Sequence, residues 1–328
     1  MILVAELHFF GTMPTEQLTA DLEGAYGLCD RVARRDKPHL HAAAQYFAYP
    51  ETRRAFAATY ASMRLIDDFV DNIPNRAELS DRTRRVAAET IGKWLQLVRD
   101  AQAGREGPGP VWTALAHTFS LFALPLEPWE DLARAMESDL YAPVFRDWDH
   151  LRAYMNGASV APAVVFMHLV MMQPTGAKGR FLNPWDHKRV ALATEDLAIF
   201  CYWVHILRDV ANDLSVGHTG LVYLPQADLE AFGLSVDHLH EMRKLGRTSA
   251  AYVRLAQFEA QRARLHLDRG RAHLDEILPI VPAENARALS TLIATYVALL
   301  ENLAAHEFDV FSRSLELTED QRARILLP

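Results

Sequence analysis

Two acidic runs constrain the fold of this chain more than any other feature of its sequence. Residues 64–71 read RLIDDFVD, and residues 208–213 read RDVAND. Each run sets two carboxylates four residues apart, which on a helix places them on one face, one turn apart. Like charges at this spacing repel each other. A fold in which the two helices face each other across a cluster of cations resolves the repulsion.

The carboxylates with this spacing are the candidate metal ligands. They are Asp67 and Asp71 in the first run and Asp209 and Asp213 in the second. Hard oxygen ligands suit Mg²⁺, which usually keeps waters and substrate phosphates in its coordination shell. The two runs therefore predict a magnesium site that binds a diphosphate.

A solvated helix face is the alternative explanation for each run, because aspartate pairs at this spacing are often exposed. The second run fits that explanation less well. Residues 197–214 read LAIFCYWVHILRDVANDL and are apolar on nearly every face, which predicts a buried helix. An ionised carboxylate there must be paired or bound to a metal. Arg208 can pair with one of the two acids but not easily with both.

Three further segments accompany the runs: AMESDL at 135–140, YMNGASVA at 154–161 and YLP at 223–225. In this order and spacing, the five segments resemble the squalene/phytoene synthases over roughly residues 20 to 310. The resemblance implies an all-α, single-domain helical bundle of the isoprenoid synthase type around a central cavity. It also implies about three Mg²⁺ ions that join the two acidic helices to the diphosphate of an allylic substrate.

The resemblance also implies roles for individual residues. Asp67, Asp71, Asp209 and Asp213 would hold the metal ions. Arg64 and Arg208 would contact diphosphate oxygens. The residues that would line the cavity are Tyr60, Asp139 and Tyr154.

The chain departs from the family pattern at several positions. His205 stands where the family usually has a metal-binding asparagine, and Tyr202 stands where a glutamine is common. Residues 217–225, GHTGLVYLP, contain extra residues and no arginine, and the Ser-rich phosphate-contacting segment is replaced by KPHLHA at 37–42. In the family that the chain resembles, those positions largely serve a second diphosphate. The site for one allylic diphosphate is therefore intact by this comparison, and the site for a second is altered.

Ionisation of an allylic diphosphate leaves a carbocation, which needs an apolar cavity with aromatic faces. An aromatic residue at helical spacing is more often plain core, so each candidate has that alternative. The aromatic candidates are Phe56, Tyr60, Phe69, Tyr154, Phe166, Tyr202 and Trp203, and Tyr223 is a further candidate for substrate binding.

The acceptor that captures the cation is open at this stage. We expect a small aromatic molecule, because the contacts to a second diphosphate are altered. His39, His41 and His205 would then act as a base or orient the acceptor, since imidazole titrates near neutrality. For each histidine the alternative is a satisfied buried polar contact. The alternatives for the whole protein are head-to-head condensation of two prenyl diphosphates, a terpene cyclase, or a non-catalytic scaffold that has lost the chemistry.

Composition agrees with a single enzyme domain over residues 1–328, of which 50% are hydrophobic. A net charge of -8 argues against a nucleic-acid partner. The predicted partners are an allylic prenyl diphosphate and a small-molecule acceptor. The longest apolar stretch, residues 157–172, is short for a transmembrane segment, so we expect a cytoplasmic protein and leave peripheral membrane contact open.

Helical periodicity extends along nearly the whole chain, with no alternating strand pattern. The predicted helices cover residues 15–36, 50–71, 81–101, 111–123, 128–141, 149–172, 188–214, 235–277 with a break near Gly246, and 283–313.

Overall fold

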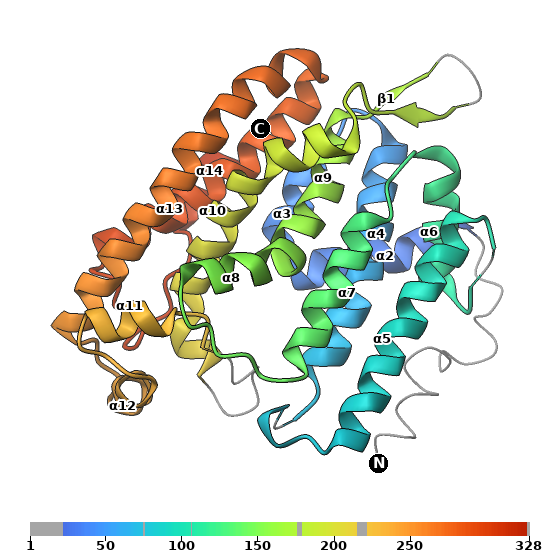
Figure 1. Ribbon diagram of the computed structural model, residues 1–328. Coiled ribbons are helices and arrows are strands. Elements are labelled where there is room, and N and C mark those ends of the chain that lie inside the picture. Colours follow the sequence, from blue (N-terminus) through green and yellow to red (C-terminus); the bar gives the residue numbers. More distant parts are fainter. Residues whose placement is uncertain (1–21, 75, 106, 176–178, 215–221, 327–328) are drawn as a thin grey trace.

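The computed structural model of the chain describes residues 22–326 apart from 75, 106, 176–178 and 215–221. These residues form a bundle of α-helices, so the predicted all-α fold is confirmed (Figure 1). In the described part, strands occur only as a short antiparallel pair, β1 (Gln173–Pro174) and β2 (Phe181–Leu182). The helices are α2 (Leu22–Asp36), α3 (Pro38–Ala44), α4 (Pro50–Asp71), α5 (Asp81–Gln102), α6 (Pro110–Leu121), α7 (Glu127–Asp139), α8 (Trp148–Met155), α9 (Ala161–Met171), α10 (His187–Asp213), α11 (Gln226–Ala231), α12 (Val236–Leu245), α13 (Ala250–Ile277), α14 (Ala283–Ala305) and α15 (Glu319–Leu326).

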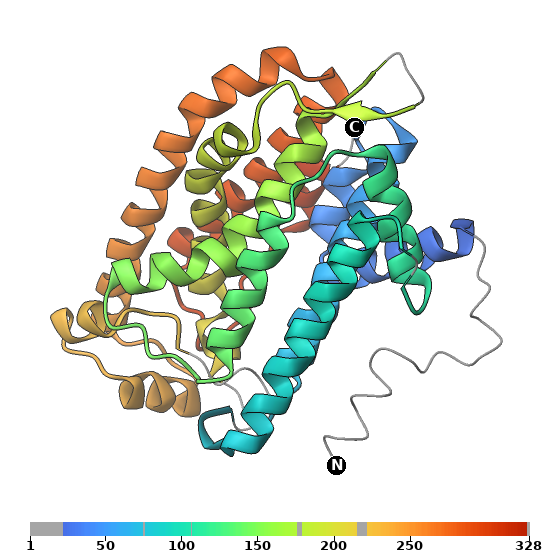
Figure 2. The same ribbon diagram turned by 45° about the vertical axis from the view of Figure 1, so that its right-hand side comes forward.

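Helix α10 is a central element of the bundle. Val190, Phe200 and Val210, spread along its length, are all buried. Helix α13 packs along it, and α9 and α14 also contact it. In Figure 1 the orange α13 and red α14 lie on one side of the molecule, and the blue-green α5 lies on the other. Figure 2 shows the orange α13 along the left edge of the bundle. The prediction of a buried helix in the second acidic run is confirmed.

Both acidic runs lie at the C-terminal ends of their helices. Asp71 is the last residue of α4, and Asp213 is the last residue of α10. Asp67 and Asp209 lie one turn earlier. The C-terminus of a helix carries partial negative charge from its unpaired carbonyl groups, so carboxylates there are unfavourable unless cations compensate them. Each aspartate pair is therefore repelled twice, by the like charge of its partner and by the negative end of its own helix.

The predicted helix 149–172 is interrupted by a π-helical segment, Asn156–Val160, between α8 and α9. Gly157 in this segment packs against α7, and a Cβ atom there would overlap the backbone carbonyl of Asp131 and the side chain of Ala135. The π-turn and the glycine together let α7 approach closely. Such π-turns often occur at functional sites.

Other boundaries also differ from the prediction. The segment 235–277 is two helices, because Gly246 ends α12 in the left-handed conformation with φ 61°. The last long helix ends at Ala305 rather than 313. Short helices α3, α11 and α15 were missed because a hydrophobic period needs more than two turns to be visible. Predicted residues 15–21 lie outside the described part of the chain.

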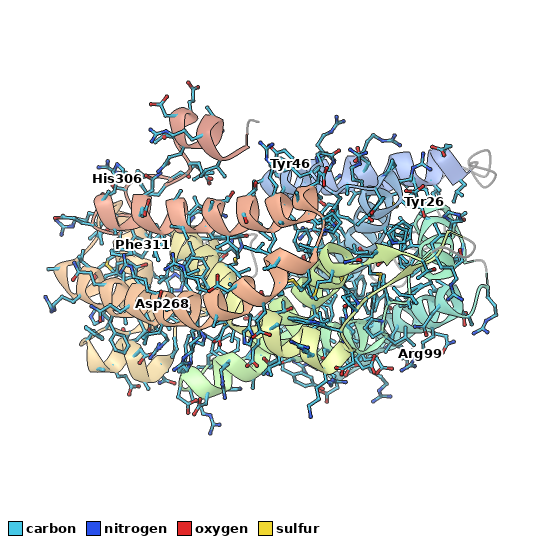
Figure 3. All side chains as sticks on the ribbon, turned by 90° about the horizontal axis from the view of Figure 1, so that it is seen from above. Tyr26, Tyr46, Arg99, Asp268, His306 and Phe311 are labelled. Carbon is cyan, nitrogen blue, oxygen red and sulfur yellow. The ribbon has the colours of Figure 1, made fainter. Side chains whose placement is uncertain are left out.

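Three helical segments are long and apolar enough to cross a membrane by length and composition alone: Trp148–Met171, His187–Asp213 and Ala283–Ala305. The apolar stretch at residues 157–172 is therefore part of a longer segment than the sequence suggested. Helix α8, the π-helical turn and α9 follow one another without a break and form one segment of 24 residues. Between 56% and 72% of each apolar window is buried inside the protein. Seen from above, charged side chains such as Arg99 and Asp268 lie on the outside (Figure 3).

Candidate functional site

A large cavity extends into the bundle between α4, α7, α9, α10 and α14 and encloses about 510 Å³. This volume lies within the roughly 300–1,000 Å³ of ligand pockets in proteins. Both acidic runs reach it, through Asp67 and Asp71 on α4 and through Asp209 and Asp213 on α10. The fold therefore brings together two runs that are far apart in the sequence.

Most of the predicted site residues line this cavity, although their roles in binding and catalysis stay predictions. The predicted residues that line the cavity are His39, Phe56, Tyr60, Arg64, Asp67, Asp71, Asp139, Tyr154, Phe166, Tyr202, His205, Asp209, Asp213 and Tyr223.

Four predicted residues do not line the cavity. His41 forms a partly buried hydrogen bond through Nε2 to Asp30, at 2.7 Å. Phe69 lies two residues from both Asp67 and Asp71, and residues two apart on a helix point in different directions. Trp203 is fully buried and packs against Trp148. Arg208 is not among the residues that line the cavity, and it forms an ion pair with Asp209. The altered residues 217–221, including His218, lie outside the described part of the chain.

On α4, each carboxylate of the pair has an arginine nearby. The Arg64 guanidinium contacts both Asp67 and Asp68, and it lies 3.5 Å from Asp36. Arg76 lies 3.3 Å from Asp71. Burial and the neighbouring Asp71 still raise the pKa of Asp67 to about 6. Arginine contacts therefore do not fully compensate this pair.

On α10, the two carboxylates differ. Arg208 donates two hydrogen bonds to Asp209, at 2.7 and 2.8 Å. Burial acts against ionisation, but the Arg208 contacts leave the pKa of Asp209 lowered. Asp213 forms no ion pair with any described residue. Burial raises its pKa to about 7, and the charges of Asp209 and of Asp71 on the other helix add to the effect. As expected from the sequence, Arg208 serves only one acid of the pair.

His205 is held as a neutral hydrogen-bond acceptor at Nδ1. Burial and the charge of Lys37 lower the pKa of His205 well below its usual value. Arg208 Nη2 lies 3.0 Å from Nδ1, and because a guanidinium only donates, Nδ1 accepts. The 3.2 Å approach of Nδ1 to Asp209 is then not an ion pair. A neutral ring with Nδ1 unprotonated carries its proton on Nε2, so the free nitrogen of His205 is a donor.

Asp139 and Tyr154 form a buried pair in the cavity wall. The Tyr154 hydroxyl donates to Asp139 Oδ2 over 3.0 Å, and Asp139 Oδ1 has no hydrogen-bond partner among the described residues. Burial raises the pKa of Asp139 to about 7, although Arg76 lies 4.0 Å away. The carboxyl group thus stands ready to accept or hold a proton near neutrality. Arg76 itself is buried and lies between Asp71 and Asp139, which nothing in the sequence indicated.

Lys37 is a charged residue of the cavity that the sequence did not lead us to predict as part of the site. It precedes α3 and lines the cavity together with the carboxylates of α4 and α10. Burial and the nearby Arg208 lower the pKa of Lys37, and the charges of Asp67 and Asp209 act in the opposite direction. Lys37 forms no ion pair with a described carboxylate. The signal was present in the altered segment KPHLHA, in which the lysine adds a cation.

The two carboxylate pairs fit divalent metal ions. Asp71 raises the pKa of Asp213 from the opposite helix, so the pairs repel each other across the cavity, and a cation between them would relieve that repulsion. In the described residues, no three His, Cys, Asp or Glu side chains converge closely enough to hold an ion by themselves. Carboxylate oxygens are ligands that suit Mg²⁺, which binds through one or two carboxylates and completes its shell with waters and substrate phosphates.

Comparison with known sequences places this arrangement in context. The model of a protein family described as squalene/phytoene synthase matches residues 32–322. The 15-cis-phytoene synthase of a Synechocystis strain is 26% identical over 306 residues, which cover 92% of this chain and 82% of that protein. The chloroplastic phytoene synthase 3 of Zea mays is 27% identical over 90% of this chain and 63% of its own length.

Comparison with solved structures identifies the same fold. A dehydrosqualene synthase superposes with a TM-score of 0.74 at 17% identity, over 93% of this chain and 95% of that one. The squalene synthase of Alicyclobacillus acidocaldarius superposes with a TM-score of 0.69 at 23% identity, over 92% and 98% of the two chains. The helical bundle around a cavity that the sequence predicted is the fold of these proteins.

Proposed function

Because the chain belongs to the squalene/phytoene synthase family, we propose that it joins two allylic prenyl diphosphates head to head and releases diphosphate. Members of this family are prenyltransferases, so the predicted enzyme class is confirmed. The choice of acceptor changes, however. The similar proteins are named phytoene, squalene and dehydrosqualene synthases, and none of these names supports the aromatic acceptor that we expected from the altered residues.

The observation that carries the proposal is the position of Lys37 beside both carboxylate pairs. The aromatic acceptor was expected because residues 217–225 lack an arginine for a second diphosphate. Lys37 supplies a cation in the cavity, and it forms no ion pair with a described carboxylate that would hold it away from substrate. An ammonium group binds phosphate as a point charge. The cavity thus has a candidate contact for the second diphosphate.

The chain's own residues divide the work in the proposed reaction. Mg²⁺ held by Asp67, Asp71, Asp209 and Asp213 would stabilise the negative charge of the leaving diphosphate. Arg64 lies among these groups and adds positive charge. His205 presents its Nε2–H group and would donate to a diphosphate oxygen rather than bind a metal ion. His205 stands where the family usually has a metal-binding asparagine, and this assignment gives it a different role, as a hydrogen-bond donor to the substrate.

The apolar part of the cavity would hold the prenyl chains and exclude water from the carbocation. The ring centroids of Phe56 lie 6.0 Å from those of both Tyr60 and Phe166. Those of Tyr202 and Tyr223 are 6.4 Å apart. Aromatic faces at such positions stabilise positive charge. The Asp139–Tyr154 pair lies in the same wall and would hold a proton near the reacting carbons.

A second candidate function is transfer to an aromatic acceptor, which two neutral imidazoles favour. His39 lies 3.4 Å from the Tyr296 hydroxyl, and burial and the charge of Lys37 lower its pKa to about 4. His205 is neutral as well. Both line the cavity and could orient a phenol or accept its proton. This function needs only one bound diphosphate, which separates it from the first.

The deciding experiment is incubation with C15 or C20 allylic diphosphate and Mg²⁺, with analysis of the organic products. Head-to-head condensation gives a C30 or C40 product without any added acceptor. Replacing Lys37 by Gln should lower its formation about 10- to 100-fold and should weaken binding of the second diphosphate more than that of the first. Lys244→Gln, on the exposed face of α12, is the matched control. A product that appears only with an added phenol would contradict the proposal and support the second candidate.

A further inference from the structure

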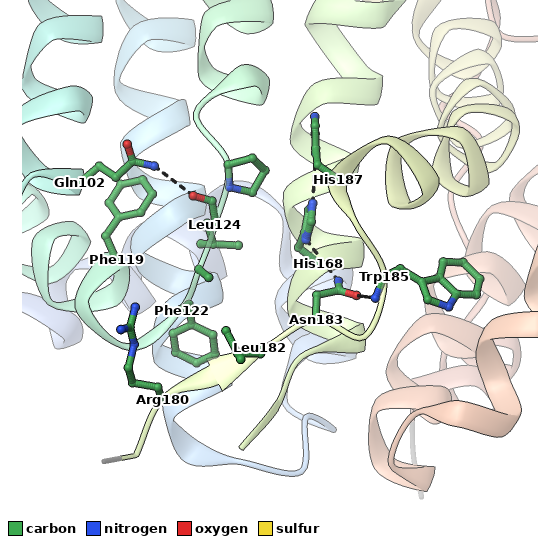
Figure 4. A pocket seen from close by; sticks show the side chains of 12 residues that line it. Gln102, Phe119, Phe122, Leu124, His168, Arg180, Leu182, Asn183, Trp185 and His187 are labelled. Atoms are coloured by element: carbon green, nitrogen blue, oxygen red, sulfur yellow. Dashed lines mark hydrogen bonds between the residues drawn. The ribbon is translucent and has the colours of Figure 1, made fainter. Parts of the chain in front are cut away.

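Two groups of buried polar side chains outside the large cavity differ in how far hydrogen bonds explain them. In the wall of a second cavity, the two ring nitrogens of His168 lie 3.2 Å from Asn183 and 3.2 Å from His187 (Figure 4). These contacts account for His168 in structural terms. The other group lies between α11 and α13, where Glu259 is 0% exposed and its Oε1 atom has no hydrogen-bond partner among the described residues. A buried polar atom without a partner is unfavourable, so this carboxyl group needs an explanation.

Glu259 shares one arginine with a second carboxyl group. Arg262 Nη1 donates to Glu259 Oε2 over 2.6 Å and to Asp228 Oδ2 over 2.8 Å. Asp228 belongs to α11, whereas Glu259 and Arg262 lie about one turn apart on α13. Two carboxylates beside one guanidinium leave one negative charge without compensation. Where the group is buried, a proton removes that charge most simply.

The proton belongs on Glu259. The side chain of Glu259 is fully buried, whereas those of Asp228 and Arg262 are each 17% exposed. Burial raises the pKa of Glu259 to about 8; the charge of Arg262 opposes this shift, and the charge of Asp228 and a hydrogen bond with Asp228 add to it. A carboxyl group donates a hydrogen bond only when it is protonated, so the more buried Glu259 donates to Asp228. A neutral carboxyl group also tolerates an unpaired oxygen better than an ionised one does.

The surroundings of the cluster supply no second cation to Glu259. Among the described residues, Glu259 forms an ion pair with Arg262 alone. Burial raises the pKa of Tyr252, and the charge of Glu259 adds to that shift, which places the two groups near each other. The groups that face the cluster from the surrounding elements are Asp228 of α11, Tyr252, Arg262 and His266 of α13, Asp196 of α10, which lies 2.5 Å from His266, the uncharged Trp148 of α8, and the uncharged Phe311 after α14.

The cluster holds the segment that brings Tyr223 to the large cavity. Asp228 lies in the first turn of α11, and Tyr223 lines the cavity just before that helix begins. The first backbone N–H of α11 donates to the Phe145 carbonyl over 2.8 Å, and the Phe145 ring stacks on Tyr223 with centroids 5.8 Å apart. Arg262 also lies 4.4 Å from the ring centroid of Trp148, the first residue of α8. One guanidinium therefore attaches both α11 and the start of α8 to α13 (Figure 1).

We propose that Asp228, Glu259 and Arg262 form a proton-dependent anchor that positions Tyr223 in the wall of the large cavity. With the proton in place, Arg262 contacts one carboxylate and one neutral carboxyl group, and α11 stays attached to α13. When the proton leaves, two like charges face each other beside one guanidinium, and Asp228 moves away with the short helix α11. Tyr223 then loses its fixed position against Phe145. The proposal rests on the proposed function only in taking the large cavity as the place where the prenyl substrate binds.

Hydrogen–deuterium exchange of residues 222–231 tests the anchor without any turnover. The attached state holds one more proton than the detached state between the ordinary pKa of a glutamate, 4.5, and about 8. After correction for the intrinsic exchange rate, the protection of these amides should therefore fall about tenfold per pH unit from about pH 5 to about pH 8 and then level off. Glu259→Gln stays neutral and can still donate to Asp228, so it should remove this slope.

Two controls separate the anchor from other effects of pH. Protection of α5, on the other side of the molecule, reports any change in the stability of the whole protein. Glu230→Gln removes a carboxylate from the exposed surface of α11 and should keep the slope. It matches Glu259→Gln in chemistry and lies on the helix that the anchor holds.

Turnover tests whether the anchor positions Tyr223. The unmodified protein and Glu259→Gln should turn over equally fast at pH 7, where Glu259 is mostly protonated. At pH 9 the variant should be about tenfold faster, because only about one Glu259 in ten keeps its proton one unit above a pKa of about 8. A role in stability alone would change the melting temperature but not this ratio at a temperature where both proteins are folded.

Each measurement has a result that would overturn the proposal. An equal slope of protection in the unmodified protein and in Glu259→Gln would mean that the cluster is not a proton-dependent anchor. The expected slope with equal turnover of both proteins at pH 9 would mean that the anchor does not position Tyr223. If no prenyl diphosphate is turned over at all, the proposed function fails, and the exchange measurement still decides whether the anchor exists.

Discussion

The two aspartate pairs look alike in the sequence but differ in the folded protein. On α4, Asp67 contacts Arg64 and Asp71 lies near Arg76. On α10, Asp209 accepts two hydrogen bonds from Arg208, and Asp213 has no ion-pair partner among the described residues. The comparison shows that one spacing rule can produce two electrostatic environments. The α10 pair consists of one strongly ionised carboxylate and one that gains most from an added cation.

The largest expected effect is on the rate, and it tests whether both pairs act in the same site. Asp67→Ala and Asp209→Ala should each lower turnover by about 10³-fold or more, because each removes part of the metal binding that stabilises the leaving group. EDTA should abolish activity. Asp68→Asn, one residue further along α4 and outside the cavity, is the control and should keep most of it. Full activity in EDTA would contradict the prediction that both pairs bind metal ions in one site.

Stability of the metal-free protein separates the two pairs. At pH 8, Asp213→Asn should raise the free energy of unfolding by roughly 2 kcal/mol, because it removes a buried charge that forms no ion pair with a described residue. Asp71→Asn should give no such gain, since it also removes the Arg76 contact. Thermal unfolding in EDTA measures both. A large loss of stability in Asp213→Asn would instead identify an ion-pair partner for Asp213.

The pH dependence of stability extends the comparison to Asp139. Burial raises its pKa to about 7, well above the value of an unfolded chain. The folded protein therefore binds more protons between about pH 4 and pH 7, and metal-free stability should fall as pH rises through that range. In Asp139→Asn, the decrease in the free energy of unfolding over this pH range should be smaller by roughly 1 kcal/mol. The full effect of removing the buried charge is not expected, because the variant also loses the attraction between Asp139 and Arg76. Thermal unfolding midpoints at pH 5 and pH 8 measure the effect. If the difference between the two midpoints were the same in the unmodified protein and in Asp139→Asn, Asp139 would not be the group responsible.

The smallest expected effects distinguish two histidines of the same segment. His39 lines the cavity, whereas His41 does not line it and pairs with Asp30. His39→Ala should lower turnover about tenfold through lost contacts in the cavity, and His41→Ala should change it less than about twofold. Steady-state rates at saturating substrate measure both. Equal losses in the two variants would mean that α3 acts as a unit rather than through the residue that faces the cavity.

Local patterns in the sequence determined much of this protein. The 3.6-residue period identified the long helices, and the spacing of Asp67, Asp71, Asp209 and Asp213 identified the faces that meet in the cavity. The prediction that Arg208 would pair with one of the two acids agrees with its hydrogen bonds to Asp209. These features depend on residues within a few turns of each other, so one sequence is enough to reveal them.

Only the tertiary structure decided which side chains share the cavity. Lys37 and Arg76 come from segments with no helical period to orient them, yet packing places them beside the carboxylates. Phe69 and His41 have suitable chemistry, but the rotation of their helices turns them away. Burial and distant charges set the protonation of His205 and Asp213, and both depend on which helices pack together. A sequence gives spacing along a helix, whereas pairing across helices depends on contacts between segments far apart in the chain.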